Sequence, residues 1–158
     1  MNILVLCTGN SARSILLECL LNRLSEGRVT AYSAGSKPSG AVHPQSLVLL
    51  AEKGFATSGL RSKSWDEFAV ANAPKMDAVI TVCGSAAGET CPIWPGAPVR
   101  SHWGVEDPAA AEKRDWGSAF ETAFQRLKAR AEALLSQDFE SMNASELKSL
   151  LDTIGKSH

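Results

Sequence analysis

Hydrophobic positions along the chain follow two spacings in turn, one typical of strands and one typical of helices. Continuous apolar or β-branched runs predict buried strands. These runs cover Asn2–Cys7, 28–33, 77–83 and Val99–His102. Apolar residues three and four positions apart predict amphipathic helices between the strands. These helices cover Arg13–Leu24, 44–53, 113–135 and part of 140–158.

This alternation predicts an α/β fold: a single domain with a four-stranded parallel sheet and helices on both faces. The length of 158 residues fits one domain. We place that domain at residues 1–138 and a tail with a short amphipathic helix at 139–158. Asn143 and Glu146 have the spacing of a capping box for this helix, and Gly155 is its expected end. Ser64 and Glu67 predict a further short helix.

The charge balance excludes several classes of partner. Sixteen basic residues face 17 acidic ones, so the formal net charge is -1. Such a balance gives no electrostatic attraction to nucleic acid or to an anionic membrane. No apolar run reaches the about 20 residues of a membrane helix, and no basic residue precedes the first apolar run as in a signal peptide. We therefore expect a cytoplasmic protein, whose cysteines are catalytic, redox-active or buried rather than paired in permanent disulfides. We also expect it to be a monomer, although nothing in the sequence itself specifies the oligomeric state.

The first predicted strand ends at Cys7, and the first predicted helix begins at Arg13. A loop of small residues between a strand and a helix can turn its backbone N–H groups inward and bind an anion. Arg13 adds a planar guanidinium suited to a tetrahedral oxyanion. Helix N-termini and cations favour the thiolate form of a cysteine, and the Ser14 hydroxyl can donate to it. We expect Cys7 to be a nucleophile and the loop to bind its substrate. The predicted substrate-binding residues are Thr8, Gly9, Asn10, Ser11, Ala12, Arg13 and Ser14.

The stretch "CTGNSARS" at the N-terminus resembles the C-x5-R signature of the low-molecular-weight protein tyrosine phosphatase family. That family carries a second catalytic element, an Asp-Pro pair in a late loop. "HWGVEDPAAAEK" contains the match, Asp107-Pro108. The resemblance implies that Asp107 is a general acid, which protonates the oxygen that leaves as the thiolate attacks. Taken alone, the pair is also an ordinary turn signal.

The stretch "TVCGSAAGETCPIWPG" resembles the thioredoxin-coupled arsenate reductases, which share the phosphatase fold. The resemblance covers residues 1 to 135 and implies a relay of three thiols. Cys7 attacks arsenate, Cys83 then attacks Cys7 and releases arsenite, and Cys91 attacks Cys83. The resulting Cys83–Cys91 disulfide is reduced by thioredoxin. No tightly bound cofactor is expected, and phosphate or sulfate would compete with arsenate.

Two departures from the family pattern concern the reductant and the loop. Ala12 stands where many members carry a second cysteine, which removes one protection of Cys7 against overoxidation. The eight-residue separation of Cys83 and Cys91 is longer than in the relatives. A glutaredoxin or a low-molecular-weight thiol therefore stays open as the reductant. Since neither a helix nor a strand of that length brings two cysteines within disulfide distance, we expect residues 84–90 to change conformation.

Simpler interpretations of the cysteines remain. Cys83 can be a small core residue and Cys91 an idle thiol. A zinc site formed with His102 fits no familiar spacing, so we expect no metal site. Cys19 lies on the apolar face of the first predicted helix and is expected in the core.

Two other functions compete with arsenate reduction. The first is a tyrosine phosphatase that uses Cys7, Arg13 and Asp107 alone. Against it, the Asp-Pro pair is followed by alanines, whereas the phosphatases usually have aromatic residues there. The second is a non-enzymatic thiol switch or oxyanion sensor.

Several other residues receive structural roles. Asn10 and Ser33 match positions that brace the loop in the family, although both can be ordinary turn residues. His43 is expected to start a helix. Packing is expected for Trp94 and Trp103, and solvated charges for Arg61, Lys63 and Arg100.

Overall fold

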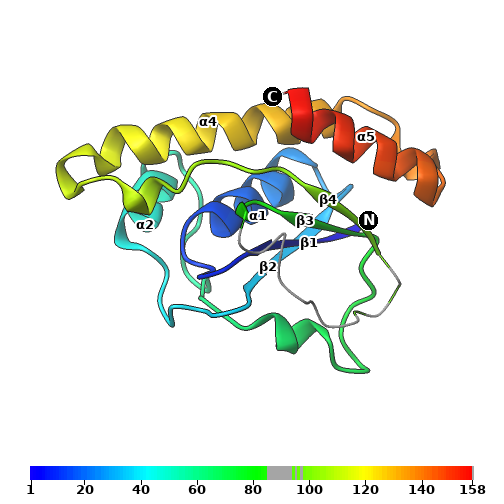
Figure 1. Cartoon of the computed structure of the whole chain (residues 1–158), viewed down its shortest axis with the longest axis horizontal. Helices are drawn as coiled ribbons and strands as arrows, with labels where there is room; N and C mark the ends of the chain where they lie inside the picture. The colour runs from blue at the N-terminus through cyan, green and yellow to red at the C-terminus, as the bar shows by residue number, and fades with distance from the viewer. Residues whose placement is uncertain (85–93, 95, 97, 158) are drawn as a thin grey trace.

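The sheet places the ends of its central strands at one edge, as Figure 1 shows. A computed structural model describes residues 1–84, 94, 96 and 98–157. Its four strands run parallel in the order β2-β1-β3-β4. Their bounds are β1 Asn2–Cys7, β2 Thr30–Gly35, β3 Ala78–Thr81 and β4 Val99–His102. The predicted α/β single domain with a four-stranded parallel sheet is confirmed.

Strand β1 is central and is buried on both faces, which explains its unbroken apolar run. Its residues Ile3, Val5 and Cys7 belong to the larger core beneath the helices. Its alternate residues Leu4 and Leu6 belong to a second core on the opposite face. The helices over the larger core are α1 Arg13–Leu24, α2 Pro44–Glu52, α4 Trp116–Leu135 and α5 Ala144–Ser157.

The second core is smaller and is covered by a 3-10 helix, Trp65–Phe68, in the part of the chain that the structure describes. The Ser64 side chain accepts a hydrogen bond from the Asp66 N–H and so caps this helix. Phe68 packs in this core with Val79 and Trp94. The short helix predicted from Ser64 and Glu67 is confirmed, in the tighter 3-10 form.

Helix α5 packs on the same core as the rest of the chain. Leu147, Leu151 and Ile154 are buried in the larger core. Asn143 and Glu146 form the predicted capping box, because each side chain accepts a hydrogen bond from the other's backbone N–H. These contacts fix the last helix over the β4 edge of the sheet.

Several predicted boundaries are wrong. Strand β3 covers Ala78–Thr81 and not 77–83, and α4 begins at Trp116 and not at residue 113. Gly155 lies inside α5 and does not end it. A Cβ there would overlap the carbonyl oxygen of His102, so the glycine permits close packing on β4. The second strand covers Thr30–Gly35 and not 28–33. Arg28, which precedes it, binds Glu140 and the carbonyl oxygens of Leu135 and Gln137 through its guanidinium. Among the described residues, no helix is long and apolar enough to cross a membrane.

Candidate active site

Cys7 lies at the carboxyl end of β1 with its sulfur facing the loop that follows. The side chain is buried, with 4% of its surface exposed. The Asn10 N–H donates to Cys7 Sγ at 3.2 Å, and Ser14 Oγ lies 2.9 Å from the same sulfur. A backbone donor and a hydroxyl on one sulfur stabilise negative charge there.

The loop between Cys7 and Arg13 is held from outside by its carbonyl groups. The carbonyl oxygens of Thr8, Gly9 and Ser11 each accept hydrogen bonds from the surrounding chain. The donors are the N–H groups of Lys37, Ser39 and His43 and the hydroxyls of Ser62 and Ser46. Because these carbonyls point outward, the loop's N–H groups are free to turn toward the sulfur. This is the arrangement of an anion-binding loop at a helix N-terminus.

Gly35 lets the end of β2 lie directly against this loop. It pairs with Cys7 in the sheet register. A Cβ at this position would overlap the Thr8 carbonyl oxygen and lie 3.0 Å from the Asn10 nitrogen. Only glycine therefore allows the loop and the strand to pack this closely.

Asn10 connects the loop to the interior. It is fully buried and takes the left-handed conformation, with φ of 47°. Asparagine tolerates this conformation better than most residues. Its Nδ2 donates to Ser14 Oγ at 2.9 Å, and its Oδ1 accepts the Lys63 N–H at 2.9 Å. Asn10 therefore braces the loop, as the family resemblance implied.

Lys63 lies beneath the loop, buried and not solvated as the sequence suggested. Its ammonium donates to Ser33 Oγ at 3.3 Å and lies 3.5 Å from Asn10 Oδ1. Ser33 in turn donates to the Glu18 carboxylate at 2.8 Å. Burial lowers the pKa of Lys63 and raises the pKa of Glu18, while each residue's charge opposes the other's shift. No local signal in the sequence marked Lys63, because only the tertiary fold brings it under Asn10.

Arg13 joins the loop to the segment after β4. Its Nη1 donates to the Val105 carbonyl oxygen at 2.9 Å. Its Nη2 lies 3.7 Å from Asp107 Oδ2. The Asp107 side chain also caps the short 3-10 helix Pro108–Ala110 by accepting the Ala109 N–H. The structure thus brings together the predicted Cys7, Arg13 and Asp107.

Cys83 follows β3, the strand beside β1, so both cysteines lie at the same edge of the sheet. It is 4% exposed, and its sulfur lies 3.5 Å from the Thr8 hydroxyl. Thr8 thus follows Cys7 in the sequence and contacts Cys83 in space. Cys91 and the segment 85–90, which was predicted to change conformation, lie outside the described residues.

His43 lies at the rim of the site. Its Nδ1 accepts the Gln45 N–H and so caps α2, as predicted. Its ring packs edge-on against Trp116 and also against Phe120, with centroids 4.5 and 4.8 Å away. Burial lowers the pKa of His43, and the nearby charge of Asp107 partly offsets this.

Trp94 and Trp103 are buried, so the packing role predicted for them is confirmed. Cys19, which was expected in the core, packs against it but is only partly buried. Burial raises the pKa of Cys19 to about 12, which makes it an unreactive thiol.

A strand, a cysteine in an anion loop, an arginine at the following helix and an aspartate across from it define a class of cysteine-dependent oxyanion enzymes. The sequence profile of the low molecular weight phosphotyrosine protein phosphatases matches residues 2–148. The chain belongs to this family.

Within the family, the chain is similar to arsenate reductases. It is 38% identical to the arsenate reductase of Halalkalibacterium halodurans over 70% of this chain and 76% of that one. It is 37% identical to the arsenate reductase of Bacillus subtilis, over 78% and 84%. A solved arsenate reductase in a phosphate-binding state has a TM-score of 0.70 at 29% identity, covering 85% of this chain and 96% of that one. A thioredoxin-dependent arsenate reductase from Corynebacterium glutamicum has a TM-score of 0.60 at 27% identity, covering 86% and 63%.

Proposed function

We propose that this protein reduces arsenate to arsenite. The observation that carries the proposal is the placement of two thiols at one sheet edge. Cys7 Sγ accepts a hydrogen bond inside an anion-binding loop, and Cys83 Sγ lies 3.5 Å from the loop's Thr8 hydroxyl. A phosphatase needs the first thiol alone, whereas a reductase needs a second thiol close by. The similarity to arsenate reductases of several bacteria supports the same choice.

In the first step, the Cys7 thiolate attacks the arsenic of arsenate. A sulfur–arsenic bond forms and an oxygen leaves as water. The loop N–H groups and the Arg13 guanidinium bind the remaining oxygens, and Asp107 donates the proton that the leaving oxygen requires. The 3.7 Å separation of Arg13 and Asp107 supports this division of roles, because both reach the same space.

In the second step, the Cys83 thiolate attacks Cys7 Sγ. A Cys7–Cys83 disulfide forms, the sulfur–arsenic electron pair stays on arsenic, and As(V) leaves as arsenite. Cys91 then attacks Cys83 and frees Cys7. The Cys83–Cys91 disulfide passes to thioredoxin, which supplies the two electrons of the cycle.

The remaining assignments follow from this chemistry. The protein works as a cytoplasmic monomer without a tightly bound cofactor, since the electrons arrive through thiol exchange. Phosphate and sulfate compete with arsenate, because they are tetrahedral anions of similar shape. A glutaredoxin or a low-molecular-weight thiol is the alternative reductant.

The test couples NADPH oxidation, through thioredoxin reductase and thioredoxin, to added arsenate. We expect turnover by the wild-type chain and none by Cys83→Ser. Cys19→Ser is the matched control and should keep full turnover, because Cys19 lies away from the loop. Hydrolysis of p-nitrophenyl phosphate, measured in parallel, should survive in Cys83→Ser. Arsenate-dependent turnover that is unaffected by Cys83→Ser, or phosphatase activity without any reductase activity, would overturn the proposal.

A further inference from the structure

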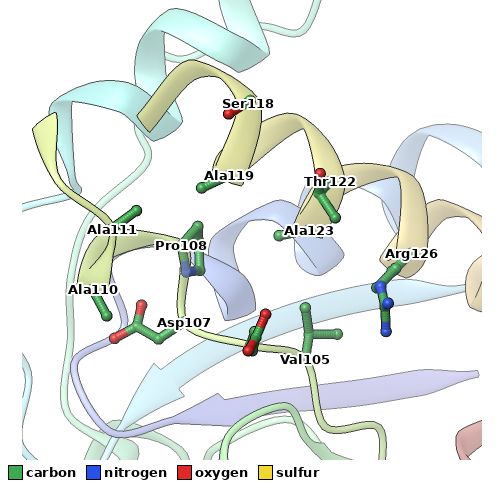
Figure 2. A pocket seen from close by; sticks show the side chains of 11 residues that line it. Val105, Asp107, Pro108, Ala110, Ala111, Ser118, Ala119, Thr122, Ala123 and Arg126 are labelled. Carbon is green, nitrogen blue, oxygen red and sulfur yellow. The ribbon is translucent and has the colours of Figure 1, made fainter. Parts of the chain in front are cut away.

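A groove of about 460 Å³ lies between α4 and the segment that carries Asp107. Figure 2 shows side chains from both elements turned toward this space. Its floor is made of small or buried apolar residues. These are Val105, Pro108, Ala110, Ala111, Ala119 and Ala123. The volume lies within the range of small-molecule sites.

Three polar side chains around this groove, Glu106, Thr122 and Arg126, are exposed to solvent. Arg126 and Glu106 both line it, yet neither forms a hydrogen bond or an ion pair with any described residue, including each other. Thr122 of α4 also lines the groove, and its hydroxyl forms no hydrogen bond with another residue that the structure describes. A cation, an anion and a hydroxyl-bearing side chain thus line one concave space, where each is open to solvent and to a ligand.

The charge of Arg126 also lies close enough to another guanidinium, that of Arg130, to repel it. Burial lowers the pKa of the neighbouring Arg130, and the charge of Arg126 lowers it further. The two guanidinium groups therefore repel each other. A negative group bound to Arg126 would offset its charge and so weaken this repulsion.

We propose that this groove binds a small zwitterionic ligand of the amino-acid or short-peptide class. Its carboxylate pairs with Arg126, its ammonium pairs with Glu106, and its backbone bonds the Thr122 hydroxyl over the apolar floor. A simple anion would use Arg126 but leave Glu106 repelling it. A purely apolar ligand would leave all three polar groups unused.

This site is separate from the anion loop, because none of the loop residues lines the groove. It does share Asp107, whose segment forms one wall. The inference stands independently of arsenate reduction, since it concerns a second ligand.

The test uses triglycine with free termini as the probe and the full chain as the protein. Calorimetry measures affinity, and ¹H–¹⁵N NMR locates the binding through the amides of Thr122 and Ala123. We expect saturable binding of triglycine and loss of binding for its N-acetylated, C-amidated form. Arg126→Ala and Glu106→Gln should each weaken binding about tenfold, the usual size of a charged hydrogen bond.

Matched controls separate a specific site from a general charge effect. Arg114→Ala and Glu132→Gln alter exposed charges outside the groove and should leave the affinity unchanged. Absence of saturable triglycine binding would overturn the proposal. Equal binding of the capped peptide or equal loss in the control variants would do the same. None of these readouts uses arsenate, so a failure here is distinct from a failure of the proposed reductase activity.

Discussion

The anion loop and the acid segment meet at Arg13, but they are held in different ways. In the loop, three carbonyl oxygens are bonded by the surrounding chain, and Asn10 is fully buried. Across from it, 45% of the Asp107 side chain is exposed, compared with 16% of the Arg13 side chain. Asp107 accepts one short hydrogen bond, from the Ala109 N–H two residues on.

Because of this difference, we expect changes in the loop to affect the stability of the protein and changes at Asp107 to affect only the reaction rate. The loop is bonded into the fold, so its geometry exists before an anion arrives and a change there disturbs folding as well as binding. The 3.7 Å contact of an exposed aspartate with an arginine contributes little to stability. A change at Asp107 should therefore affect the reaction alone. The predictions below test this contrast.

The largest expected effect is on the reaction rate, from Asp107→Asn. Removal of a general acid should lower kcat by about a hundredfold to ten-thousandfold. The melting temperature should stay the same, because the side chain is exposed and Asn can still cap the Pro108–Ala110 helix. Steady-state kinetics and calorimetry check the two halves of the prediction. Asp115→Asn, a nearby exposed aspartate, is the control, and an equal loss of rate there would contradict the role of Asp107.

The next effect combines stability and binding, from Gly35→Ala. The new Cβ overlaps the Thr8 carbonyl oxygen, so the loop must move. We expect a loss of about 1–3 kcal/mol in the free energy of unfolding, with weaker phosphate binding. Denaturant unfolding and phosphate titration measure these two quantities. Gly117→Ala, where nothing lies within 4 Å of the added Cβ, should be neutral or slightly stabilising. Wild-type phosphate affinity in Gly35→Ala would show that the loop is not fixed by β2.

A comparable loss of stability is expected from Lys63→Met. The ammonium loses its bond to Ser33, and the partly buried Glu18 carboxylate loses its nearby cation. We expect destabilisation by about 1–3 kcal/mol. The double variant with Glu18→Gln should recover part of this, because the unpaired charge is then removed. Lys75→Met, an exposed lysine, is the control. Strictly additive losses in the double variant would contradict a coupled Glu18–Lys63 pair.

The smallest effect is a pH dependence at His43. Burial holds the pKa of His43 below its usual 6.5, so the unfolded chain binds more protons than the folded chain just below that pH. This contribution to stability is complete above pH 6.5 and is lost as the pH falls toward the folded pKa. Unfolding free energies of wild type and His43→Asn, measured from pH 7.5 to 5, check this, since asparagine keeps the helix cap without titrating. A difference between the two proteins that stays constant over this range would contradict the assignment.

The sequence was a better guide to the residues proposed to react with the substrate than to the residues that hold the anion loop in place. Cys7 and Arg13 could be predicted because a strand, a small-residue loop and a helix are contiguous in the chain. Asp107 required the family resemblance, since Asp-Pro alone is also a turn. Lys63 and Gly35 could not be predicted, because their roles depend on contacts with Asn10 and Thr8 that only the folded chain makes. Gly155 was misread for the same reason, because its partner is the distant carbonyl group of His102.

The most direct test of the central claim is to identify the disulfide that arsenate produces in the Cys91→Ala variant. Without Cys91, the relay should stop after Cys83 has attacked Cys7. Peptide mass spectrometry after one addition of arsenate should find a Cys7–Cys83 disulfide, with one arsenite released per disulfide and no disulfide before the addition. Arsenite released while Cys7 and Cys83 both stay reduced, or no arsenate-dependent disulfide at all, would contradict the mechanism.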